Sequence, residues 1–171
     1  MLRRELLARD GLSAKFIYRV PADQREVQLA KQAINRGAFD PRAITDPHVF
    51  ASLLKQWLRE LPTPLLGNVK VLTVLPKAER GVLLWLVDHA LEVVACSRSN
   101  AMTAHSLAVV LAPTLYRWAA ATPEEAVATS HQVATLLRVL ISWRKMERGV
   151  PVRGESMSPS TRWSTSEGYQ L

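Results

Sequence analysis

Residues 46–66 read DPHVFASLLKQWLRELPTPLL, and this stretch decides the fold of the chain. Asp46 is a good helix N-cap and Pro47 suits the first helical position, so we expect a helix to begin here. Pro62 and Pro64 then end it. Its apolar residues recur at helical spacing and share one face: Val49, Phe50, Leu53, Leu54, Trp57, Leu58 and Leu61. The sequence therefore predicts an amphipathic helix that is anchored in the core.

Two basic residues, Lys55 and Arg59, stand four positions apart on the opposite side of this predicted helix. A pair of cations on the far face of a buried helix suits binding to an acidic partner. A solvated basic face is the alternative interpretation, and for such a pair alone it is the more common one. The pair gains meaning only from other motifs in the chain.

The composition is typical of one globular domain. The chain has 171 residues, of which 48% are hydrophobic, enough to build a core. The longest apolar region, residues 82–96, is interrupted by polar side chains and falls short of the roughly 20 apolar residues that span a bilayer. Residues 1–11 hold no long apolar segment, so no secretory signal is expected. A single cysteine, Cys96, permits no intrachain disulfide, and we expect a reducing compartment, the cytoplasm.

The formal net charge is +7, which favours acidic partners: nucleic acid, anionic lipid or an acidic protein surface. The basic residues are scattered and no zinc-finger or RNP-like motif occurs, so nucleic acid is not expected. The histidines lack metal-ligand spacing, and the hydrolase and nucleotide-binding motifs HExxH, G-x-S-x-G and GxxxxGK[ST] do not occur. We therefore expect no metal and no cofactor.

The rest of the chain predicts further helices and no strands. Asp23 and Glu26 form a capping box before a helix that Gly37 closes, and Pro76 starts a long apolar helix that reaches residue 95. Shorter or later helices are predicted over residues 2–9, with Gly11 as C-cap, over 103–111, and from Thr122 to 147. Residues 38–45, 67–73 and 96–100 are predicted loops.

These elements predict an all-α fold, a single bundle of about five to six helices. The helical domain is expected to occupy residues 1–149. Residues 150–171 are rich in Ser, Thr, Pro and Gly without periodicity, and we predict a disordered tail there.

Two further stretches carry motifs. Residues 16–22 read FIYRVPA and residues 100–117 read NAMTAHSLAVVLAPTLYR. Together with SLLKQWLRELPTPLL at residues 52–66, they resemble three motifs of RhoGAP domains, the GTPase-activating modules for Rho-family small GTPases. The first resembles the arginine-finger loop, usually written GIFRVSG, and the second resembles the later helix and turn, NKMTxxNLAxVFAPNLLR. The three motifs follow the family order over about residues 5–145, and this order is more specific than any one motif.

The resemblance implies roles for individual residues. Arg19 would be the arginine finger, which neutralises charge on the transferred phosphoryl group in the partner's active site. Lys55 and Arg59 match the basic pair that holds the GTPase and supports the finger loop. Thr114 stands where the family commonly has asparagine, so a GTPase contact or a local bond is expected to be weaker. Arg117 matches the family's next arginine, for which a structural role is expected.

The sequence also departs from the family pattern. Phe16 and Ala22 stand where the finger loop usually has glycine, which relieves the backbone of tight loops. The helix before the finger loop is short, and residues 67–74 are fewer than the family usually has between its motifs. These departures favour a shortened, divergent member.

Two functions remain open at this stage. The resemblance implies a GTPase activator, not itself an enzyme, that binds a GTP-bound Rho-family GTPase and reaches membranes only peripherally through that partner. The alternative is a degenerate RhoGAP-like module that binds GTPases or other acidic proteins without stimulating hydrolysis. Arg19 with the Lys55 and Arg59 pair favours the first function; Phe16, Thr114 and the short connector favour the second.

Overall fold

The computed structural model describes residues 1–66, 75–117 and 122–149, and over these residues the chain is helical without strands. The α-helices are α1 (Leu2–Ala8), α2 (Gln24–Asn35), α3 (Pro47–Glu60), α4 (Lys77–Ala95), α5 (Ser97–Asn100), α6 (Ala104–Leu111) and α7 (Pro123–Glu147). In the described part of the chain, 3₁₀ turns lie between them at η1 (Gly11–Ser13), η2 (Pro41–Ala43) and η4 (Ala112–Thr114). The all-α prediction is confirmed. The predictions for the 67–73 connector and the 150–171 tail lie outside the described residues.

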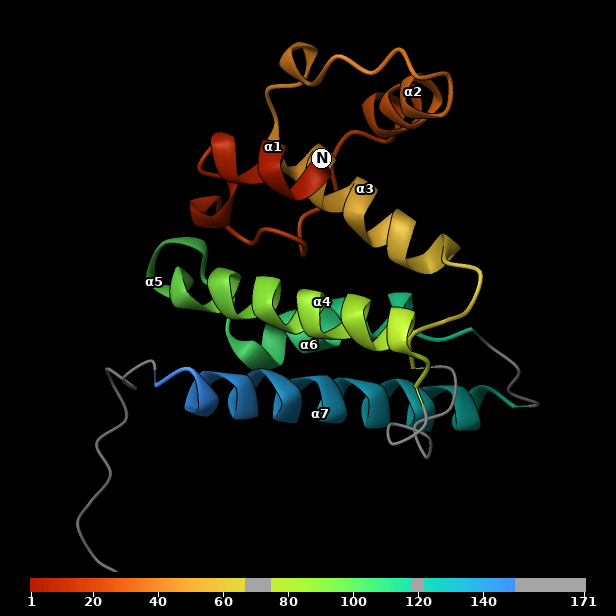
Figure 1. The fold of residues 1–171 in the computed structure, drawn as a ribbon, viewed down its shortest axis with the longest axis vertical. Coiled ribbons are helices and arrows are strands. Elements are labelled where there is room, and N and C mark those ends of the chain that lie inside the picture. Colours follow the sequence, from red (N-terminus) through yellow and green to blue (C-terminus); the bar gives the residue numbers. More distant parts are fainter. Residues whose placement is uncertain (67–74, 118–121, 150–171) are drawn as a thin grey trace, which may run out of the picture.

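The helices form layers (Figure 1). The longest, α7, runs along one side of α4 and α6 and packs on both. On the other side lie α1 and α3, which pack together, and α3 reaches the lower layer through η4. Helix α2 packs on α3 at the outer edge of the bundle. The loop between η1 and α2 lies where the layer of α1 and α3 meets the layer of α4 and α6 (Figure 1).

The predicted helix starts are confirmed by their caps. The Asp46 carboxylate accepts the His48 amide of α3 at 2.9 Å, and the Asp23 carboxylate accepts amides of α2 at 2.7 and 3.0 Å. Thr103 and Thr122 cap α6 and α7 in the same way. Each cap pairs amides that have no partner inside their own helix, which is why these residue types decide where the helices begin.

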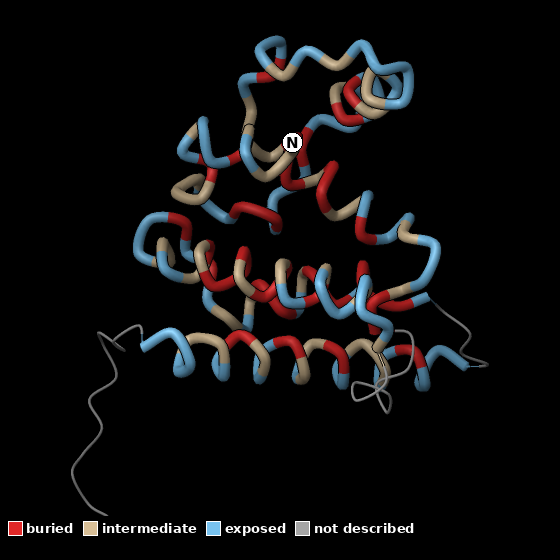
Figure 2. Tube along the Cα trace, in the orientation of Figure 1, coloured by how far each residue is buried: buried red, intermediate tan, exposed pale blue. Residues whose placement is uncertain are grey.

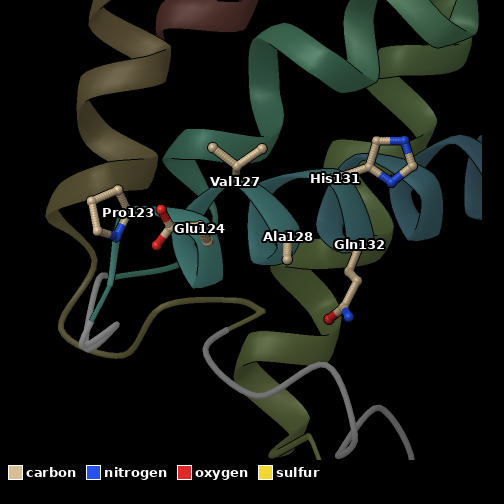
Figure 3. Close-up of a pocket in the computed structure, with 6 residues that line it drawn as sticks. All are labelled: Pro123, Glu124, Val127, Ala128, His131 and Gln132. Carbon is tan, nitrogen blue, oxygen red and sulfur yellow. The ribbon is translucent and has the colours of Figure 1, made fainter.

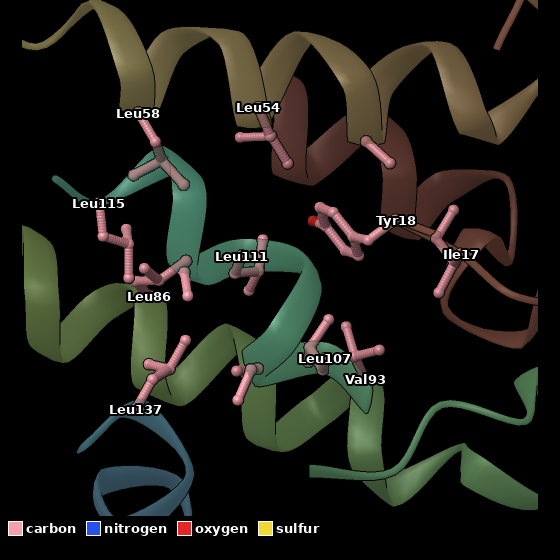
Figure 4. Packing of buried hydrophobic residues seen from close by; sticks show 14 of the residues in the cluster. Ile17, Tyr18, Leu54, Leu58, Leu86, Val93, Leu107, Leu111, Leu115 and Leu137 are labelled. Atoms are coloured by element: carbon pink, nitrogen blue, oxygen red, sulfur yellow. The ribbon is translucent and has the colours of Figure 1, made fainter. Parts of the chain in front are cut away.

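The core fills the space between the layers (Figure 2). Figure 4 shows side chains of α3, α4, α6 and α7 meeting in one cluster, and its buried members include Leu54, Leu58, Leu86, Leu107, Leu111 and Leu137. The apolar face predicted for α3 is buried except at Trp57 and at Leu61, and Leu61 is half-buried at the end of the helix. Trp57 is 42% exposed, so its assignment to the core is wrong; its ring meets the edge of the Trp85 ring at 5.9 Å between centroids.

Two local predictions also need correction. Residues 97–100 form the short helix α5 instead of a loop. Gly11 is not the C-cap of α1, because Arg9 takes that position and Asp10 adopts the left-handed conformation, with φ 50°. Gly11 is required by space: a Cβ atom there would lie 2.5 Å from Leu6 Cδ1 and 2.7 Å from the Leu6 carbonyl oxygen. The sequence thus located the end of α1 near Gly11 correctly, but the glycine is needed because Leu6 leaves no room for a side chain, and not because it caps the helix.

Candidate functional site

The candidate site is built on the loop that carries Arg19. The loop turns tightly, because the amides of Arg19 and Val20 both donate to the carbonyl of Phe16, at 2.8 and 3.0 Å. Ile17 and Tyr18 are buried, whereas Phe16, Arg19 and Val20 are exposed. The middle of the loop is thus anchored in the core and the arginine is presented to solvent.

Phe16 occupies a position at which glycine would be less strained. Its φ is 55°, in the left-handed region where a side chain costs about 1–2 kcal/mol. Its amide donates to the carbonyl of Asn100 at 2.7 Å, which ties the loop to the end of α5. The left-handed turn therefore forms here without the glycine that the motif usually has.

Asn100 is a supporting residue whose role the sequence did not reveal. It is fully buried, and its amide nitrogen donates to the carbonyls of Leu12 and Val93 at 2.7 and 2.8 Å. Its side-chain oxygen accepts the amide of Met102 at 2.7 Å. The only signal in the sequence was an asparagine that opens the third motif. The structure places it at the junction between η1, α4 and the loop that carries Arg19.

Lys55 supports the loop from α3. Its Nζ donates to the carbonyl of Tyr18 at 2.7 Å, one residue before Arg19. Burial, with a smaller effect of the Arg59 charge, lowers the pKa of Lys55 below its ordinary value. Lys55 is therefore held against the loop, and the solvated-face interpretation does not describe it. Arg59, one turn further along α3, is exposed.

Lys55 and Arg59 also line a groove between α2 and α3. Its volume is about 310 Å³, and its other lining residues are Pro21, Gln24, Val27, Gln28, Ser52 and Gln56. The walls are mostly polar and carry two cations. A groove of this kind suits polar or acidic side chains of another protein, and it begins at Pro21, next to the Arg19 loop.

The Arg19 side chain itself is free to reach a partner. No ion pair with Arg19 is found within residues 1–66, 75–117 and 122–149. Its guanidinium carbon lies 5.8 Å from the centre of the exposed Phe16 ring, a contact that contributes only about 0.5–1 kcal/mol at an exposed site. Within the described residues, no strong intramolecular partner competes for the cation.

The remaining residues assigned from the resemblance lie at the other end of α3 and near η4. Arg117 donates to the carbonyl of Pro62 at 3.1 Å and to that of Leu61, so it fastens the end of α3, as expected of a structural role. Thr114 is 3% exposed, and its hydroxyl donates to the Leu111 carbonyl at 2.7 Å. The local bond is thus present, and a GTPase contact by Thr114 stays a prediction.

Other sites offer less. No group of His, Cys, Asp and Glu side chains that could hold a metal is found among the described residues, and none of the helices described is long and apolar enough to span a membrane. A hollow of about 660 Å³ lies along the first turns of α7 (Figure 3); its walls are Pro123, Glu124, Val127, Ala128, His131 and Gln132. All six come from a single helix, on a surface separate from the Arg19 loop.

Comparison with known proteins gives the family. The model of the RhoGAP domain family matches residues 4–70 and 68–120. These segments contain the Arg19 loop, the α3 basic pair and the motif that ends at Arg117. They meet within the connector in which the sequence is shorter than the family pattern. The chain belongs to the RhoGAP family.

Individual relatives agree with this assignment. The chain is 32% identical over 157 residues to Rho GTPase-activating protein gacA of Dictyostelium discoideum, covering 83% of this chain and 46% of that protein. It is 31% identical over 176 residues to Rho GTPase-activating protein 2 of Arabidopsis thaliana, covering 94% and 40%. The chain thus spans less than half the length of these curated relatives.

The fold is also that of solved structures. Human Rho GTPase activating protein 15 superposes with a TM-score of 0.71 at 22% identity, covering 84% of this chain and 80% of that one. The BH domain of GRAF, the GTPase regulator associated with focal adhesion kinase, gives 0.65 at 24% identity, covering 85% and 91%. At these identities the likeness concerns the fold alone.

Proposed function

We propose that this chain accelerates GTP hydrolysis by a Rho-family small GTPase, with Arg19 as the arginine finger. The observation that carries the proposal is the arrangement around Arg19. Its side chain is exposed and unpaired by any acidic side chain described, while the backbone just before it is held by Lys55 at 2.7 Å. A finger needs both properties, a free cation and a fixed base.

The chemistry follows from the charge of the reaction. Phosphoryl transfer spreads negative charge over the equatorial and leaving oxygens, and a guanidinium inserted from a second protein typically raises the rate 10³- to 10⁵-fold. Arginine suits this role because it is planar, always charged and able to donate several hydrogen bonds. The reaction takes place in the GTPase, and this chain supplies Arg19 in trans. The groove with Lys55 and Arg59 would bind the GTP-bound partner.

A module that binds without stimulating hydrolysis is the second candidate. The observations that favour it are the strained backbone of Phe16, with φ 55°, and the buried Thr114, whose hydroxyl is engaged with the Leu111 carbonyl. If a partner contact requires a longer amide at residue 114, the complex would form without full catalytic alignment.

Single-turnover GTP hydrolysis by a panel of Rho-family GTPases separates the two. We expect the wild-type chain to stimulate hydrolysis, and Arg19→Ala to lower the stimulated rate about 10³-fold. Arg19→Lys should restore little of this rate, because a lysine cannot bridge two oxygens. The matched control is Arg138→Ala, which removes an exposed arginine of α7 far from the loop. Capture of the GTP-bound partner by the wild type without any stimulation would instead support the binding module.

A further inference from the structure

A polar contact in the core lies directly behind Arg19. The preceding residue, Tyr18, is 2% exposed, and Figure 4 shows its ring directed into the buried cluster. Its hydroxyl lies 2.5 Å from Nε2 of His89 on α4, and the two rings meet edge to face with centroids 5.8 Å apart. The finger-loop motif is usually written with phenylalanine at this place, so packing alone does not call for the hydroxyl.

Tyr18 is held at two points that lie on different helices. Its carbonyl accepts Lys55 Nζ of α3 at 2.7 Å, and its hydroxyl meets His89 of α4 at 2.5 Å. Its φ of 70° is unusual for a bulky residue, and such a conformation persists only where the surroundings fix it. Two anchors on opposite ends of one residue provide that fixation, immediately before Arg19.

His89 is itself fixed by its neighbours. Its ring stacks on Trp85, with an interplanar angle of 16° and centroids 5.9 Å apart. Its Nδ1 lies 3.6 Å from the Glu92 carboxylate, which binds the Arg3 guanidinium of α1 through both oxygens at 2.6 Å. A proton on Nδ1 facing this carboxylate leaves the Nε2 lone pair free to accept the Tyr18 hydroxyl.

We propose that the Tyr18–His89 hydrogen bond positions the arginine finger, which makes Tyr18 and His89 positioning residues for the reaction in the partner. This inference rests on the proposed function and deepens it. The bond fixes the side chain of residue 18, Lys55 fixes its carbonyl, and the direction in which the backbone leaves toward Arg19 is set by both. A displacement of about 1 Å in a catalytic group can cost about 100-fold in rate, so fixing residue 18 affects catalysis more than binding.

The first test measures the loop without any partner. Tyr18→Phe keeps the ring and removes the hydroxyl, and we expect amide hydrogen exchange at Arg19 and Val20 to become at least tenfold faster while the amides of α7 keep their rates. The matched control is Ile141→Val, which loosens the core of α7 and should leave Arg19 and Val20 unchanged. Unchanged exchange at these two amides in Tyr18→Phe would overturn the positioning role, whatever the activity of the protein.

The second test measures catalysis as a function of chain concentration. We expect Tyr18→Phe and His89→Leu each to lower the maximal stimulated rate about tenfold while the half-saturating concentration changes less than twofold. The double variant should be no worse than either single variant, because it removes both partners of one buried bond. His89→Gln, whose amide can pair with the hydroxyl, should recover most of the rate.

The two proposals fail in different ways. If the wild-type chain stimulates no GTPase, the proposed function is wrong, and the exchange rates still decide whether the bond fixes the loop. If the wild type stimulates hydrolysis but Tyr18→Phe has the same maximal rate, the positioning inference is wrong and the proposed function stands. A change in half-saturating concentration alone would likewise contradict positioning.

Discussion

His89 is a titratable side chain that the fold keeps away from water. It is 2% exposed, and the charged groups that face it are Glu92 on its own helix and Arg3 from α1, with the neutral hydroxyl of Tyr18 on its other side. Burial lowers the pKa of His89 from 6.5 to about 4; Glu92 opposes this shift and Arg3 adds to it. The folded chain therefore holds a neutral imidazole, as the bond to Tyr18 requires.

This lowered pKa predicts a pH dependence of stability. The unfolded chain protonates His89 near pH 6.5, whereas the folded chain does so only near pH 4, so the unfolded state binds more protons in this window. Stability is present in full above pH 6.5 and is lost as the pH falls toward 4. Between pH 7 and pH 5 we expect wild type to lose about 2 kcal/mol more unfolding free energy than His89→Gln, measured by urea denaturation.

The comparison with His89→Gln controls for the carboxylates, which titrate in both proteins. Parallel pH profiles for the two proteins would contradict the buried neutral state of His89. Asp88 is next to His89 in sequence but pairs with Arg144 in α7 and with Arg148 at its C-terminal end. Its titration should therefore appear equally in wild type and in His89→Gln.

At the level of elements, α2 and α3 show that packing decides how much a helix cap contributes to the stability of the whole fold. Both begin at an aspartate whose carboxylate accepts one or two amides. Helix α3 contributes Phe50, Leu53 and Leu54 to the core, whereas α2 contributes only Val27 and Ala30. Helix α2 lies at the outer edge of the bundle, and it has fewer buried side chains than α3 to hold it closed.

We therefore predict different responses to removal of the two caps. Each of Asp23→Ala and Asp46→Ala costs about 1 kcal/mol of helix stability. Asp46→Ala should lower the global unfolding free energy by that amount, because α3 is part of the cooperative core. Asp23→Ala should mainly speed amide exchange in the first turns of α2, through local opening. Equal losses of global stability, with no local change in α2, would show that both helices belong to one cooperative unit.

The helix caps are the part of the fold that the sequence predicted best. Asp23, Asp46 and Thr122 fixed helix starts because capping depends on a side chain and the two or three residues after it. Trp57 was misplaced because helical periodicity defines a face but not its edges. Trp57 lies at an edge, where its ring contacts Trp85 and stays largely exposed. The helix at 97–100 was missed because four polar residues carry no periodicity.

The site divides along the same line. Arg19, Lys55 and Arg59 were assigned from local motifs; the structure brings Lys55 to the loop that carries Arg19, and the roles of the three residues toward a GTPase stay predictions. The support of the loop by Asn100 and His89 was not predicted. His89 and Tyr18 are 71 positions apart, and nothing in either local sequence indicates the other. Contacts between residues far apart in the sequence depend on how the helices pack against one another, and the periodicity of each helix alone does not determine this packing.

For the whole molecule, the charge of +7 acts over a longer range than any contact in the site. A basic domain approaches an acidic partner faster than a neutral one, and the gain falls as salt screens the interaction. The cations of the α3 groove stand where such a partner would dock under the proposed function. Under the proposed function, net charge therefore bears on the rate of encounter, whereas Arg19 and the residues behind it bear on the chemical step.

This separation predicts how salt acts on the stimulated reaction. Raising ionic strength from about 50 to 300 mM shortens the screening length from about 14 to 6 Å, so the half-saturating concentration should rise several-fold while the maximal rate stays constant.

Arg59→Gln should raise the half-saturating concentration about fivefold at low salt, the effect of losing about 1 kcal/mol from an exposed ion pair, and should flatten the salt dependence. Arg138→Gln removes the same charge from the distant surface of α7 and should alter neither quantity by more than the change in net charge requires. If both variants shift the half-saturating concentration equally, overall charge and not the α3 groove guides the partner; if salt lowers the maximal rate instead, the finger loop itself depends on exposed charges.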